Sequence, residues 1–143
     1  MSNLDDFLEE ILARQETAEH ALHDGDPAPR LAMWATKDPV TLFGAAISKN
    51  GSQEVRRFFG ELASRFSDCS DWRFELVAAG ASGDLAYTVG YEHTSVSIDG
   101  HPVAPYTLRV THLYRREDGE WKIVHRHGDP PPVDPSLAGA VRR

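Results

Sequence analysis

The stretch from Leu108 to Asp129, LRVTHLYRREDGEWKIVHRHGD, constrains the fold more than any other part of the chain. Two runs of alternating residues flank the dipeptide Asp118-Gly119 within it. Asp-Gly is a strong signal for a tight turn between antiparallel strands, because both residues tolerate positive φ. The sequence therefore predicts a β-hairpin over residues 108–129.

The turn also predicts which residues of the two strands face each other. If Glu117 pairs with Glu120, four further pairs share one face, because side chains alternate across a strand. These pairs are Arg116 with Trp121, Tyr114 with Ile123, His112 with His125, and Val110 with His127. Trp121 and Ile123 are strongly apolar, so this face should point inward. We therefore expect the two paired histidines to point into an enclosed cavity.

Length and charge limit the class of protein. The chain has 143 residues, which suits one domain, expected over 1–129 and followed by a Pro-rich tail over 130–143. A formal net charge of −7 argues against a nucleic-acid partner, which needs a concentrated basic surface. No apolar run is long enough for a membrane span, and the N-terminus is acidic, so we expect no membrane association and a cytoplasmic location. Cys69 is the single cysteine, which excludes an internal disulfide.

The order of elements predicts the fold class. Apolar residues recur with a helical period over 3–23, over about 28–35, and again after Ser52. A short strand is expected over 40–43 and a loop over 67–71, and the period changes to two from Trp72 onward. Three helices followed by four antiparallel strands form an α+β domain with helices on one face of the sheet. A strongly twisted sheet would wrap around the three helices as a cone with a partly hollow interior.

The strand before the hairpin adds aromatic residues to the expected cavity. Tyr87, Val89, Tyr91 and His93 alternate along it, and we expect them on the inner face. Histidine suits proton transfer near neutral pH, and a tyrosine can donate to a substrate oxygen. The predicted catalytic residues are therefore His112, His125 and Tyr91. The predicted ligand-binding residues are Trp34, Phe43, Tyr87, Val89, His93, Val110 and His127.

Two stretches resemble a known family. They are DPVTLFGA, with Trp34 upstream of it, and RVTHLYRREDGEWKIVHRHGD. Together they resemble the SnoaL-like branch of the nuclear-transport-factor-2-like superfamily. The resemblance implies a cone-shaped α+β fold that holds a small organic molecule and forms a homodimer through the outer face of its sheet. We expect that face to carry Glu92, Arg109, Thr111 and Leu113.

Two related groups suggest different chemistry. The hairpin is similar to the association domain of calcium/calmodulin-dependent protein kinase II, which has a pocket arginine at the position of His112 and another at Val89. The ketosteroid isomerases share the implied fold, but their catalytic tyrosine, base and acid match other residues here. Those positions are Ala18, Phe43 or Gly44, and Val110 or Thr111, respectively.

Two functional classes follow from these residues. One is a small isomerase, dehydratase or cyclase that uses histidine and tyrosine for acid-base work. The other is a binding or association module that keeps the pocket without catalysing a reaction. Three imidazoles would suit zinc, but no carboxylate shares their predicted face, so we expect neither a metal nor a cofactor.

Overall fold

The computed structural model of the chain describes residues 3–132. Most of the predicted tail, residues 133–143, therefore lies outside the described part. The helices are α1 (Asn3–His23), α2 (Ala28–Met33) and α3 (Ser52–Ala63). The strands are β1 (Thr41–Gly44), β2 (Ser48–Asn50), β3 (Phe66–Ser82), β4 (Leu85–Ile98), β5 (Ala104–Glu117) and β6 (Glu120–Asp129).

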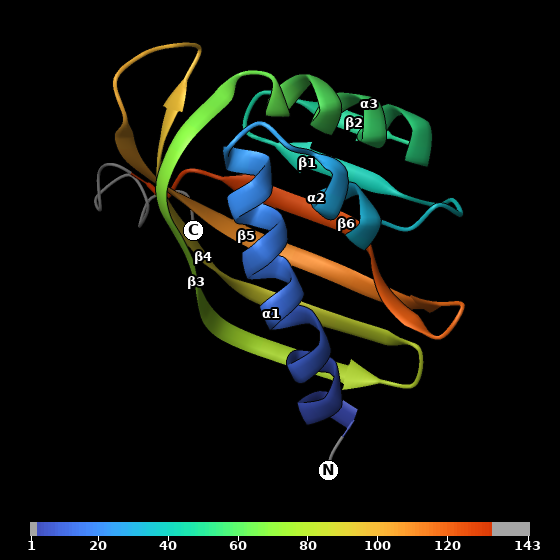
Figure 1. The fold of residues 1–143 in the computed structure, drawn as a ribbon. Coiled ribbons are helices and arrows are strands. Elements are labelled where there is room, and N and C mark those ends of the chain that lie inside the picture. Colours follow the sequence, from blue (N-terminus) through green and yellow to red (C-terminus); the bar gives the residue numbers. More distant parts are fainter. Residues whose placement is uncertain (1–2, 133–143) are drawn as a thin grey trace.

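The strands form one six-stranded sheet in the order β2-β1-β6-β5-β4-β3. Neighbouring strands are antiparallel except β1 and β6, which are parallel. Figure 1 shows the sheet curving around α1, with α2 and α3 on the same side. The predicted α+β cone with three N-terminal helices is confirmed. Among the described residues, no helix is long and apolar enough to span a membrane.

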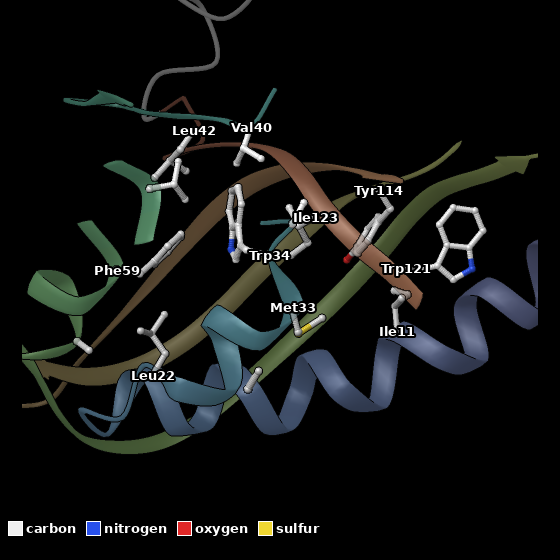
Figure 2. Close-up of a cluster of buried hydrophobic side chains, with 14 of the residues drawn as sticks. Ile11, Leu22, Met33, Trp34, Val40, Leu42, Phe59, Tyr114, Trp121 and Ile123 are labelled. Atoms are coloured by element: carbon white, nitrogen blue, oxygen red, sulfur yellow. The ribbon is translucent and has the colours of Figure 1, made fainter. Parts of the chain in front are cut away.

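Helix α1 covers the inner face of the sheet. Asp5 and Asp6 lie in its first turn, where carboxylates stabilise the positive end of the helix dipole. Gly25 follows the helix with a φ of 96°, a conformation that glycine adopts without strain. Figure 2 shows residues from all three helices meeting the sheet in one apolar core. The core includes Phe7, Ile11, Leu22, Met33, Trp34, Val55, Phe59, Tyr114, Trp121 and Ile123.

Strand β3 begins earlier than predicted. The expected loop over 67–71 lies within β3, because Ser67 pairs with Ser97 and Asp71 pairs with Ser95. The register shifts between Ser67 and Asp71, and Asp68 has a positive φ of 54°. The polar residues that suggested a loop therefore form an irregularity within the strand.

The β5–β6 hairpin is confirmed, but its register changes halfway. Pairing proceeds from Glu117–Glu120 to Tyr114–Ile123 as predicted, and Leu113 then pairs with His125. Val124 is the additional residue, so β6 has a bulge there. A one-residue bulge turns each side chain beyond it to the opposite face of the sheet from the one that unbroken alternation predicts.

The bulge corrects two of the predicted pairs. His112 pairs with Arg126 instead of His125, and Val110 pairs with Gly128 instead of His127. Arg126 consequently points to the interior and is buried. The predicted placement of His125 inside the cone is wrong.

Candidate functional site

The buried side of α1 changes from apolar to polar along the helix. Residues 7, 11, 15, 19 and 23 follow one another at four-residue intervals and are all buried. Phe7 and Ile11 are apolar, whereas Gln15, Glu19 and His23 are polar. The second half of the helix thus brings polar side chains against the inner face of the sheet.

The sheet supplies three partners from neighbouring strands. Arg126 of β6 donates to both carboxylate oxygens of Glu92 of β4, at 2.7 and 3.0 Å. Its Nη1 also donates to Nε2 of His112 of β5, at 3.1 Å. His112 has no exposed surface. These contacts join β4, β5 and β6 through buried side chains.

Arg30 completes the buried group from α2. It forms an ion pair with Glu19, and its Nη2 lies 3.4 Å from Nε2 of His112. The guanidinium carbon lies 5.2 Å from the centre of the Phe59 ring. We call the five residues Glu19, Arg30, Glu92, His112 and Arg126 the charged cluster.

His23 and Tyr106 form a hydrogen-bonded pair beside this cluster. Nδ1 of His23 lies 2.7 Å from the backbone oxygen of Glu19, and a carbonyl oxygen can only accept. Nδ1 therefore carries the proton and donates it. In the neutral ring, Nε2 then accepts from the Tyr106 hydroxyl at 3.0 Å. His23 also stacks on Phe66, with ring centres 4.7 Å apart.

The neighbouring donors also determine the protonation of His112. Both guanidinium groups next to its Nε2 can only donate, so Nε2 accepts and the neutral ring carries its proton on Nδ1. Nδ1 has no hydrogen-bond partner within residues 3–132. Burial, followed by the nearby charges of Arg126 and Arg30, lowers the pKa of His112 well below its ordinary value.

Burial also governs the other ionisable groups here. It lowers the pKa of His23 to about 4 and raises the pKa of the Tyr106 hydroxyl. Burial alone would raise the pKa of Glu92, but the charge and hydrogen bonds of Arg126, together with the charge of Arg30, outweigh it and the pKa is lowered. At neutral pH both histidines are therefore neutral and Glu92 is ionised.

A cavity of about 230 Å³ opens above these groups. Its polar lining comes from Glu19, His23, Arg30, Glu92, Tyr106 and Arg126. Its apolar walls come from Leu22, Leu42, Ile47, Phe58, Phe59, Leu62, Phe66 and Leu108. The cavity thus has apolar walls and one polar region, as sites for small organic molecules do.

The residues predicted from the hairpin separate into two groups. His112 and Val110 face the interior as expected, although neither lines the cavity. His125 and His127 lie on the outer face, where both rings make T-shaped contacts with Phe43. Phe43 is 45% exposed and lies at the edge of the cavity.

The predicted facing of β4 is wrong. The inner face carries Ala86, Thr88, Glu92 and Thr94, which are buried. The expected cavity residues Tyr87, Val89, Tyr91 and His93 therefore lie on the outer face. His93 contacts Glu75 and Thr107 there, at 3.0 and 3.1 Å. Glu92 accordingly belongs to the interior and not to the expected subunit interface.

Trp34 belongs to the core. It is 1% exposed, packs on Phe59 with ring centres 5.4 Å apart, and forms an isolated bridge with Ile123. It therefore packs against Phe59, a residue of the cavity wall, and does not line the cavity itself.

The sequence contained a signal for the polar residues of α1 that line or surround the site, although they were not among the predicted site residues. Gln15, Glu19 and His23 continue the spacing of Phe7 and Ile11, which indicates a polar half on the buried side of α1. Arg126 carries no comparable signal, because its inward direction depends on the bulge at Val124. Within the described residues, no three His, Cys, Asp or Glu side chains converge as metal ligands would.

Solved structures share this fold. A protein from Streptomyces avermitilis, proposed to be a dehydratase of the nuclear-transport-factor-2-like family, is 20% identical with a TM-score of 0.69, over 90% of this chain and 99% of that chain. A ketosteroid isomerase-like protein from Erwinia carotovora atroseptica is 16% identical with a TM-score of 0.70, over 92% and 99%. A proposed calcium/calmodulin-dependent protein kinase type II association domain from Thiobacillus denitrificans is 19% identical with a TM-score of 0.67, over 84% and 94%.

These identities establish a common fold and no shared activity. None of the curated proteins matches the sequence. The model of the SnoaL-like domain family matches residues 11–133, which is most of the chain. The chain therefore belongs to the SnoaL-like domain family, within the nuclear-transport-factor-2-like fold.

Proposed function

We propose that this domain binds a small organic molecule with an apolar body and one polar head group. The observation that supports this function most strongly is the cavity of about 230 Å³, with aromatic and aliphatic walls above buried charged side chains. The apolar body would contact Phe58, Phe59 and Leu62, and the head group would approach Arg126 and Tyr106. Such a site gains affinity from apolar burial and orientation from a few polar groups.

The protonation states favour binding without chemistry. Glu19 and Glu92 are tied to arginines, and His23 has a pKa of about 4. An effective general base needs a pKa nearer the working pH. His23, the histidine that lines the cavity, does not meet that condition.

An acid-base enzyme, an isomerase or dehydratase, is the second candidate. The His23–Tyr106 hydrogen bond at the cavity wall favours it, because a proton could pass from substrate to the phenol and on to Nε2. Hydrogen–deuterium exchange at the α-carbon of 2-tetralone, followed by NMR, separates the two candidates. Exchange that the protein accelerates and that Tyr106→Phe abolishes would establish the enzyme. Exchange at the buffer rate would support the binding domain.

Filling the cavity should weaken ligand binding. Leu108 lines the cavity from β5, so Leu108→Trp would place an indole in the space that a ligand needs. We expect 2-naphthamide to bind the original protein and to bind this variant at least about tenfold more weakly, which is at least about 1.4 kcal/mol. Isothermal titration calorimetry measures both.

The matched control places the same ring outside. Leu85 is 62% exposed, so Leu85→Trp should leave the affinity unchanged. Equal binding by the Leu108→Trp variant and the original protein would contradict the proposed location.

We also propose that two copies associate through the outer face of the sheet. That face exposes several large apolar side chains, namely Phe43, Val77, Leu85, Tyr87 and Leu113. A second copy of the same face would cover them in a symmetric interface. Sedimentation is expected to give twice the chain mass of 15.9 kDa.

A charge in the centre of that face should separate the copies. Leu113 is 43% exposed on β5, so Leu113→Asp costs the single chain little but would bury a carboxylate in the interface. We expect this variant to sediment as a monomer with unchanged circular dichroism. A dimer of unchanged affinity would place the interface elsewhere.

A further inference from the structure

The charges around the cavity cancel. Arg126 is paired with Glu92 through two hydrogen bonds, and Arg30 is paired with Glu19. Both guanidinium groups donate to Nε2 of His112, which makes that ring neutral, and burial lowers the pKa of His23 to about 4. Two guanidinium groups and two carboxylates therefore leave this region without net charge, although two arginines line the cavity.

We infer that the cavity selects an uncharged ligand whose head group accepts hydrogen bonds, such as a carbonyl or amide oxygen. This inference rests on the proposed function and specifies its ligand class. A carboxylate in the cavity would give up its hydration while facing Glu92 and Glu19 as well as the arginines. A cationic ligand would likewise give up its hydration, and Arg30 and Arg126 would repel it while Glu19 and Glu92 attract it.

The free donors of Arg126 support an acceptor in the ligand. Nη1 donates to Glu92 and His112, and Nη2 donates once to Glu92. One Nη2 proton and the Nε proton are not used in these contacts. Gly128 leaves room beside them, since a Cβ at that position would lie 3.3 Å from Nη2 and 3.5 Å from Nε. Both Arg126 and Gly128 line the cavity.

Tyr106 presents an acceptor to the ligand. Its hydroxyl proton is donated to His23, so its oxygen offers only lone pairs to the cavity.

Glu92 is the residue that determines whether the cavity prefers a charged or an uncharged ligand. It neutralises Arg126, whose remaining donors are free.

Two probes of nearly the same shape test the inference. 2-Naphthamide is uncharged, and 2-naphthoate carries one negative charge at pH 7.5. Isothermal titration calorimetry with the original protein should show the amide binding at least about tenfold tighter. Equal or tighter binding of the naphthoate would overturn the inference and leave the proposed function standing. Failure of both probes to bind would contradict the proposed function and the inference with it.

Removing one carboxylate should reverse the preference. Glu92→Gln leaves Arg126 without its counter-charge, so we expect the naphthoate to bind this variant about tenfold tighter than the amide. Glu75→Gln is the matched control, because Glu75 contacts His93 on the outer face. It should keep the original preference.

Circular dichroism would establish that the Glu92→Gln variant is folded. If it is not, Glu19→Gln removes the other carboxylate and should shift the preference in the same direction. An unchanged preference in a folded variant of either kind would contradict the role of charge balance.

Discussion

Replacing Arg126 with methionine is expected to lower the free energy of unfolding by about 3–5 kcal/mol. The change leaves Glu92, which is 2% exposed, without the guanidinium that balances its negative charge in the interior. It also removes the closer of the two donors to Nε2 of His112. Urea unfolding followed by tryptophan fluorescence measures the difference.

Two further variants test whether the unpaired charge of Glu92 causes the loss of stability. Arg126→Met combined with Glu92→Leu removes both charges and should recover most of the lost stability, because the cost arises from one unpaired buried charge. Arg109→Met breaks the ion pair with Asp129 on the outer face and should cost less than about 1 kcal/mol. Equal costs for Arg126→Met and Arg109→Met would contradict the buried role of the Glu92–Arg126 pair.

Lowering the pH from 6.5 to 4 is expected to remove about 3 kcal/mol of stability through His23. Its pKa lies at about 4 in the folded protein, mainly because it is buried, against an ordinary value of 6.5. Between these values the unfolded chain binds a proton that the folded chain does not, so acid favours unfolding. Above pH 6.5 the ring is neutral in both states and has no effect. His112, whose pKa is also lowered, acts in the same direction.

Unfolding in urea at several pH values between 4 and 7.5 measures this effect. His23→Gln should flatten the dependence of stability on pH by the share of one proton. Stability that does not change between pH 7 and 4.5 would show that His23 is not held neutral by burial.

The sequence predicted the elements because they depend on local patterns. The Asp118-Gly119 turn has φ values of 54° and 81°, as a tight hairpin requires, and the pairs next to it follow. The three helices were predicted from their apolar periods. These features depend on residues close together in the chain.

The site was predicted poorly because its arrangement depends on contacts between distant residues. The bulge at Val124 turns Arg126 inward and His125 outward, and the alternating pattern continues through it without a break. The aromatic residues of β4 suggested an inner face, but Glu92 and Thr88 lie there instead, and Glu92 is paired with Arg126 of β6. Among the predicted catalytic residues only His112 faces the interior, where it does not line the cavity, and its role in any reaction stays a prediction.

One measurement tests the central claim, that a ligand binds in the cone above neutral histidines and paired charges. Long-range ¹H–¹⁵N correlation spectra report the protonation of each imidazole, and they would be recorded at pH 7.5 before and after addition of 2-naphthamide. We predict neutral Nδ1–H rings for His23 and His112, and a ligand-induced shift that is larger at His23 than at His125 or His127. Doubly protonated His23, or shifts confined to His125 and His127 on the outer face, would contradict the account.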